Sequence, residues 1–132
     1  MSETQAPISL CWFEIPVLDL ERAQRFYRAV FGCSFSIEPG ASGVAGITLA
    51  MFEPKRECPA VNGCLIHGTP LKPSAEGAVI YFNVGPDLSE TLARAEAAGT
   101  TVLVPKTGIG SYGSFAHILD CEGNRIGIHS QT

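Results

Sequence analysis

The order of secondary structure expected from the sequence repeats once along the chain, and this repeat constrains the fold more than any other feature. Apolar residues follow strand or helix spacing in the order strand, helix, three strands, and the same order then returns. Such a repeat predicts two βαβββ modules that complete one another's hydrophobic surface. The expected strands cover 11–17, 33–37, 45–52, 62–67, 78–84, 101–105, 114–119 and 125–129, and the helices follow Asp19 and Asp87.

Capping residues indicate where the two helices begin and end. Asp19 precedes the first helix as its N-cap, and Gly32 ends that helix. Asp87 precedes the second helix, and Glu90, three residues later, completes a predicted capping box. Gly99 ends the second helix.

A segment without periodicity separates the two halves. Residues 68–77, GTPLKPSAEG, hold two prolines and two glycines and are the expected linker. The modules then span about 8–67 and 78–130 of a single domain that covers residues 1–132. The alternative is a plain α+β sandwich in which the similarity of the halves is accidental.

Composition excludes several classes of function. The net charge is -4, which does not favour binding to nucleic acid or to an anionic membrane. The N-terminal residues lack an apolar signal core, and no stretch approaches the ~18 apolar residues of a membrane span. The five cysteines include no Cys-x-x-Cys pair, so we expect a cytoplasmic protein with reduced thiols, most of them small core residues.

Alternation along the strands separates a core face from a polar and aromatic face. Phe13, Ile15 and Val17 share the face that the helix must cover. The opposite face carries mixed side chains, and two curved sheets placed side by side would enclose them in a cleft typical of small-molecule sites. These side chains are Trp12 and Glu14 from the first strand, Tyr81 and Asn83 from the fifth, and Arg125 and His129 from the last.

Three runs of sequence resemble the vicinal oxygen chelate superfamily, which includes glyoxalase I, extradiol dioxygenases, fosfomycin resistance enzymes and bleomycin-binding proteins. They are IPVLDLERAQRFYRAVFGCSF, VIYFNVGPDLSETLARAEAAGTTVLVPKTGIG and FAHILDCEGNRIGIHS, the last with Cys121 where the family usually has proline. The resemblance implies an α+β fold of two βαβββ modules that form a curved mixed-sheet cleft. In the enzymes of the family, a divalent metal in that cleft binds His, Glu or Gln from the first, fourth, fifth and eighth strands.

The family's metal positions carry unsuitable residues in this chain. Three of them fall on Trp12, Val79 and Gly127, none of which binds a metal, so we expect no cofactor. The alternative is a shifted metal site built from Glu14 and His129 with His67 or His117.

The leading expectation is therefore a homodimeric protein that binds a small organic ligand without the usual metal. The alternatives are a lyase, isomerase or dioxygenase with a shifted metal or Glu14 as general base, and a dimeric interaction module with a vestigial cleft. Several candidates also have structural explanations: Glu14 can pair with Arg125, and His117 or Asn83 can hold neighbouring groups. His67 and His129 can simply be solvated. The expected cleft residues are Trp12, Glu14, Tyr81, Asn83, Tyr112, His117 and His129.

Overall fold

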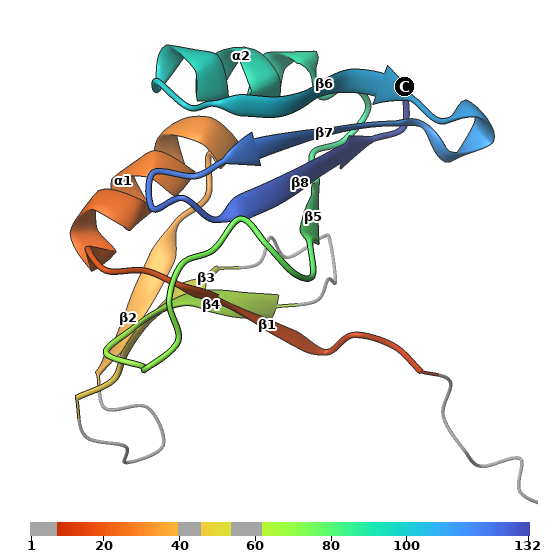
Figure 1. The fold of residues 1–132 in the computed structure, drawn as a ribbon. Coiled ribbons are helices and arrows are strands. Elements are labelled where there is room, and N and C mark those ends of the chain that lie inside the picture. The colour runs from red at the N-terminus through yellow and green to blue at the C-terminus, as the bar shows by residue number, and fades with distance from the viewer. Residues whose placement is uncertain (1–7, 40–45, 54–61) are drawn as a thin grey trace, which may run out of the picture.

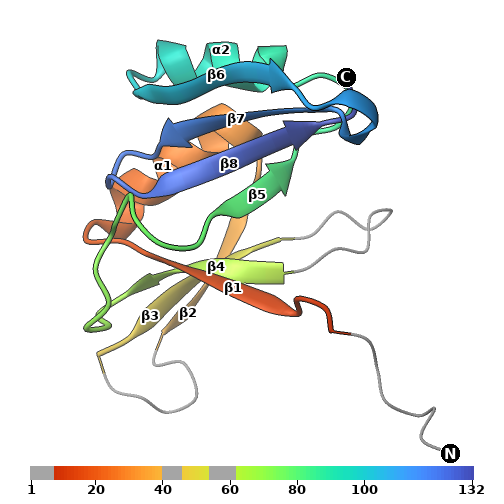
Figure 2. The same cartoon turned by 45° about the vertical axis from the view of Figure 1, so that its right-hand side comes forward.

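Each half of the chain forms its own mixed sheet with the same strand order. The computed structural model describes residues 8–39, 46–53 and 62–132, which form two four-stranded sheets and two α-helices (Figures 1 and 2). The sheets run β1-β4-β3-β2 and β5-β8-β7-β6, with the first pair of each sheet parallel and the other pairs antiparallel. The predicted α+β fold of two βαβββ modules is thus confirmed, and the matching topologies argue against an accidental similarity.

The observed elements follow the predicted order. The first module contains β1 (Trp12–Pro16), α1 (Leu20–Phe31), β2 (Phe35–Pro39), β3 (Thr48–Phe52) and β4 (Asn62–His67). The second contains β5 (Ile80–Asn83), α2 (Ser89–Ala97), β6 (Val102–Gly108), the short 3-10 turn η2 (Gly110–Tyr112), β7 (Ser114–Leu119) and β8 (Arg125–Ser130). Residues 40–45 and 54–61 lie outside the described residues, so the expected start of the third strand at 45 is not described.

Helix α1 begins and ends as its capping residues predict. The Asp19 carboxylate accepts a hydrogen bond from the Arg22 backbone N–H at 3.0 Å. Gly32 adopts a left-handed conformation with φ of 69° and ends the helix. The strand predicted at 33–37 begins only at Phe35, because the chain must first leave this turn, where the Cys33 thiol donates to the Tyr27 carbonyl.

The capping box predicted for the second helix is wrong. Helix α2 begins at Ser89, and Glu90 lies 3.6 Å from Arg94 instead of reaching back toward the start of the helix. Asp87 accepts a hydrogen bond from the Ser89 backbone and another from the Lys106 ammonium on β6, both at 2.9 Å. The bond from Lys106 is the main cause that lowers the Asp87 pKa well below its usual range. The tertiary ion pair therefore competes with the local capping geometry.

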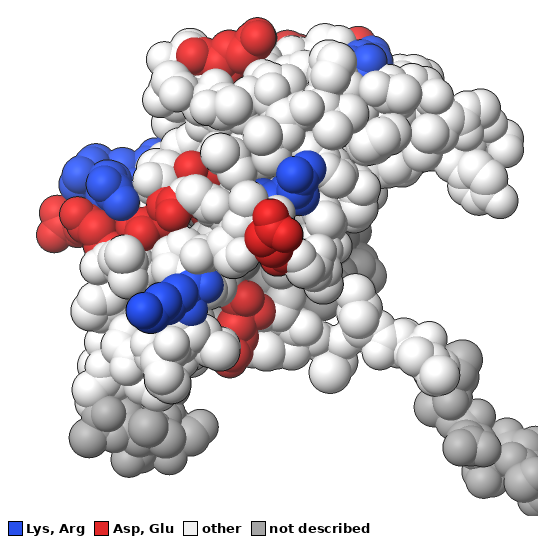
Figure 3. All heavy atoms as spheres, in the orientation of Figure 1, with Lys and Arg blue, Asp and Glu red and all other residues white. Residues whose placement is uncertain are grey.

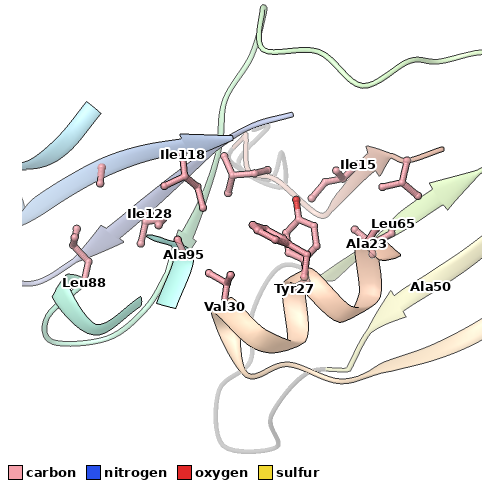
Figure 4. Close-up of a cluster of buried hydrophobic side chains, with 14 residues drawn as sticks. Ile15, Ala23, Tyr27, Val30, Ala50, Leu65, Leu88, Ala95, Ile118 and Ile128 are labelled. Atoms are coloured by element: carbon pink, nitrogen blue, oxygen red, sulfur yellow. The ribbon is translucent and has the colours of Figure 1, made fainter. Parts of the chain in front are cut away.

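One hydrophobic core joins the two modules within the chain. Figure 4 shows that α1 places Ala23, Tyr27 and Val30 between residues of both sheets, among them Ile15 and Ile118. The predicted core face of β1 is correct, since Ile15 and Val17 are buried and Phe13 packs against the same cluster. Burial of this shared apolar surface is the main force that holds the modules together.

Glu122 adds a polar connection between the modules. Its carboxylate, with a side chain only 1% exposed, accepts from the backbone N–H groups of Leu18 and Asp19 at 2.9 and 3.0 Å and pairs with Arg22 at 3.0 Å. The turn before β8 thereby binds the beginning of α1, where a negative charge is favourable.

Most of the cysteines that the structure describes are small core residues, as expected. Cys64 is fully buried and Cys33 and Cys121 are half-buried, whereas Cys11 is exposed; all four are free thiols, and Cys58 lies outside the described residues. None of the helices in the described part of the chain has the length and apolar character that a membrane crossing needs.

Candidate functional site

Residues of β1 from the first sheet and of β5 and β8 from the second line one shallow pocket. On the core side, the ring of Phe13 on β1 lies 5.8 Å from the ring of Phe82 on β5 in an edge-on contact. Because side chains alternate along a strand, the neighbours of these two residues lie on the opposite face. The structure thus brings Trp12 and Glu14 to the same side of the molecule as Tyr81, as the sequence predicts.

Glu14 lies on the predicted face of β1. The side chain is exposed, and its carboxylate accepts a hydrogen bond from the Trp12 indole N–H at 3.3 Å. The pairing of Glu14 with Arg125, one of the explanations that the sequence left open, is not observed, because Arg125 instead binds His117 and the carbonyl of Ala75. The carboxylate therefore faces the cleft without a cation partner among the described residues.

Glu14 also lines a shallow pocket where β1, the 68–77 segment, β5 and β8 meet. The pocket has a volume of about 160 Å³, below the usual range for a drug-sized ligand, so such a ligand would also cover the neighbouring cleft face. Acidic and basic side chains lie next to one another over the middle of the face seen in Figure 3, without a large area of either sign. The lining includes Glu14, Pro16, Lys72, Ser74, Glu76, Asn124 and Arg125.

A hydrogen-bonded row crosses the second sheet from β5 to β7. Tyr81 on β5 and His117 on β7 both pair with Gly127 on the intervening strand β8, so all three positions share a face. The Tyr81 hydroxyl lies 2.6 Å from His117 Nε2, and Arg125 Nη1 lies 3.0 Å from His117 Nδ1. Arg125 Nε also donates to the Ala75 carbonyl at 3.0 Å, which fixes the guanidinium from a second side.

Gly127 makes room for this row. A Cβ atom at position 127 would lie 2.5 Å from the Tyr81 ring, far inside van der Waals contact. The ring therefore occupies the space that a larger side chain would need. This is the position at which the resemblance places a metal ligand of the family.

The surroundings of His117 favour the neutral imidazole, because they lower its pKa. Burial is the larger cause that lowers its pKa from the ordinary value, and the positive charge of Arg125 lowers it further. A guanidinium has only N–H donors, so Nδ1 of His117 must accept the bond from Arg125. Both ring nitrogens are then engaged, one with Arg125 and one with Tyr81.

The other predicted cleft residues on this sheet hold local structure. His129 Nε2 donates to the carbonyl of Tyr112 in η2 at 2.6 Å, so the ring is not simply solvated. Asn83 Oδ1 accepts from the Gly85 backbone at 3.0 Å and holds the adjoining loop, one of the explanations the sequence left open. Tyr112 itself is strongly exposed at the tip of the β6–β7 connection.

The candidate metal ligands do not lie together in the described part of the chain. No three His, Cys, Asp or Glu side chains come together suitably for a metal ion within 8–39, 46–53 and 62–132. His67 is exposed at the end of β4, and no described hydrogen bond links it to Glu14, His117 or His129. The described residues therefore do not show the shifted site that the sequence left as an alternative, and the absence of a metal stays a prediction.

Several residues at the site were missed in the sequence. Phe115 shares the face of His117, and its ring packs against Tyr81 with centroids 6.4 Å apart. Alternation along SFAHIL would have identified it. Lys72, Ser74 and Glu76 enter the pocket from the predicted linker, a segment whose path no periodicity signals.

Comparisons with known proteins agree with the observed fold. The family model described as "Bleomycin resistance protein-like N-terminal" matches residues 10–47. A glyoxalase/bleomycin resistance protein from Streptomyces sp. CB03234 is 27% identical with a TM-score of 0.66, and the match covers 92% of this chain and 100% of that one. The family model and these solved structures support the resemblance to the vicinal oxygen chelate superfamily and show that the chain has its fold.

Two further solved structures show the range of this vicinal oxygen chelate fold. TnmS3, an antibiotic binding protein from the same Streptomyces, is 25% identical with a TM-score of 0.66 over 97% of this chain and 99% of TnmS3. A V278E mutant of glyoxalase I from Zea mays is 18% identical with a TM-score of 0.67; the match covers 92% of this chain but only 45% of the maize protein, about half its length. No curated protein matches the sequence.

Proposed function

We propose that this protein of the vicinal oxygen chelate fold binds a small organic molecule in the cleft and does so without a metal ion. The observation that carries the proposal is the position of Tyr81, whose ring lies over Gly127. A ring and a hydroxyl group thus stand where the resemblance places a metal ligand. The similarity to TnmS3, which is described as an antibiotic binding protein, supports binding as the activity.

A second candidate function is catalysis with Glu14 as a general base. The observation that favours it is the Glu14 carboxylate, which lines the pocket and has a hydrogen bond only from Trp12 among the described residues. An unpaired carboxylate beside a bound ligand can accept a proton. Turnover of a bound compound that is lost in Glu14→Gln while binding remains would favour this candidate over simple binding.

Metal-free binding gives the first testable prediction. After dialysis against a chelator, elemental analysis is expected to find well under one transition metal per chain. A thermal-shift screen of metabolites and antibiotics in the presence of the chelator is expected to yield stabilising compounds, since a ligand at 100 times its Kd adds about 2.7 kcal/mol to stability.

The screen needs a control at the site and has a clear contrary result. Tyr81→Ala should abolish the shift, whereas Arg25→Met, on the exposed face of α1, should preserve it. Near-stoichiometric zinc, nickel, iron or manganese, or compounds that bind only after a metal is added, would contradict the proposal.

The proposal includes a homodimer. Ile8 and Leu10, which precede β1, and Leu18, which follows it, are large apolar residues with high exposure. Strand β1 is also an edge of its sheet, and a second copy would cover both features. Light scattering at micromolar concentration is expected to give twice the chain mass, and a monomer mass would count against it.

A further inference from the structure

Arg125 determines the direction of the hydrogen bonds that run across the second sheet through His117 to Tyr81. Arg125 can only donate, and its Nε–H is already used by the Ala75 carbonyl. Its Nη1–H therefore donates to Nδ1 of His117, which must be unprotonated. In the neutral imidazole the single proton then lies on Nε2.

This tautomer determines what the Tyr81 hydroxyl does. His117 Nε2–H donates to the Tyr81 oxygen across 2.6 Å, so that oxygen is an acceptor in the row. The hydroxyl proton of Tyr81 must point elsewhere, and the described residues offer it no acceptor. Since Tyr81 is 49% exposed on the cleft face, its O–H is directed toward the cleft.

The surroundings of this free donor are aromatic. The Tyr81 ring is fixed by Gly127 beneath it and by the edge of Phe115. Trp12 on β1 is 40% exposed and offers a second aromatic surface, and its indole N–H donates to the Glu14 carboxylate. Aromatic ligands pack favourably on such surfaces, and a buried acceptor on the ligand needs a donor.

We propose that Tyr81 is the residue that orients the ligand, through a hydroxyl group whose direction is set by Arg125 and His117, and that the ligand is an aromatic compound with a carbonyl or phenolic acceptor oxygen. This inference rests on the proposed binding function. Arg125 and His117 are positioning residues, because they act through Tyr81 and not by contact with the ligand.

The first experiment tests the row in the protein without any ligand. Ring 15N NMR of the full chain at pH 7.5 is expected to show His117 as the neutral Nε2–H tautomer, assigned by loss of the signals in His117→Gln. Arg125→Met removes the donor to Nδ1 and should redistribute the tautomers. Arg25→Met, a matched loss of an arginine on the exposed face of α1, should leave the His117 signals unchanged.

The second experiment tests the ligand contact with two probes of similar shape. 2-Acetylnaphthalene carries a carbonyl acceptor and 2-ethylnaphthalene does not, and the fluorescence of Trp12, the single tryptophan, reports binding of both. The ketone is expected to bind about fivefold more tightly than the hydrocarbon to the wild-type protein. Tyr81→Phe should remove this preference by weakening only the ketone, and His117→Gln should reduce it.

The outcomes separate this inference from the proposed function. An imidazolium or Nδ1–H form of His117 at pH 7.5 would contradict the proposed direction of the hydrogen bonds from Arg125 to His117 and from His117 to Tyr81. Equal binding of the two probes, or a ketone preference that survives in Tyr81→Phe, overturns the role of Tyr81 while the binding function stands. If neither probe binds and the thermal-shift screen also yields no compound, the proposed function fails and this inference fails with it.

Discussion

Replacing Asp120 with alanine is expected to lower the free energy of unfolding by about 3–4 kcal/mol, which would be among the largest effects of any single side chain. Asp120 is 5% exposed and lies where the two modules meet. Its carboxylate accepts from the Tyr27 hydroxyl at 2.5 Å and from the backbone N–H groups of Glu122 and Asn124 at 2.8 and 2.9 Å. Alanine would leave these donors without an acceptor, and two of them belong to the buried residues Tyr27 and Asn124.

Two variants separate the contributions of this cluster. Tyr27→Phe removes one donor and keeps the carboxylate, so we expect a loss of about 1–2 kcal/mol. Asp120→Asn keeps the shape but turns an acceptor oxygen into an N–H₂ group near the Tyr27 hydroxyl and Asn124 Nδ2, so its effect should fall between the other two. Urea denaturation with unchanged m-values measures all three, and a loss below about 1 kcal/mol for Asp120→Ala would contradict the assignment.

The fold could be predicted because its signals are local and repeated. Alternation in β1 placed Phe13 and Glu14 on opposite faces, and a slip of one residue would have put a carboxylate in the core. Asp19 and Gly32 marked both ends of α1 without any tertiary information. The second helix shows the limit of such signals, because Asp87 has a stronger partner in Lys106, which is distant in the sequence.

The site could be predicted only in part, because its chemistry depends on register between strands. The sequence placed Tyr81, His117 and Arg125 on cleft faces, but their contact requires the two pairings through Gly127. A glycine in a strand says nothing by itself about the ring above it. The resemblance to the superfamily indicated where a metal ligand is missing, and the structure supplies the physical reason in the position of Tyr81.

Gly113→Ala is expected to be the most damaging glycine substitution in the β6–β7 connection, with a loss of about 3 kcal/mol or more. Gly113 has φ of 96° and ψ of -136°, a conformation that is favourable only for glycine. A Cβ there would also lie 2.1 Å from the Ser130 carbonyl oxygen, which is backbone of the neighbouring strand β8 and has little room to move. The substitution should therefore push η2 away from β8 and break the bond from His129 to the Tyr112 carbonyl.

Gly123→Ala is the control, because Gly123 also has a positive φ and lacks the close contact. Gly123 has φ of 89°, and a Cβ at this position meets no atom within 4 Å. Its cost should thus be limited to the backbone strain of about 1–2 kcal/mol. Urea denaturation compares the two variants, and the 15N signals of His129 report whether η2 has moved. Equal losses in both variants would mean that the approach of Gly113 to β8 does not matter. A larger loss in Gly113→Ala with an altered His129 would establish that this contact holds the tip of the second sheet, and Tyr112 with it, beside the cleft.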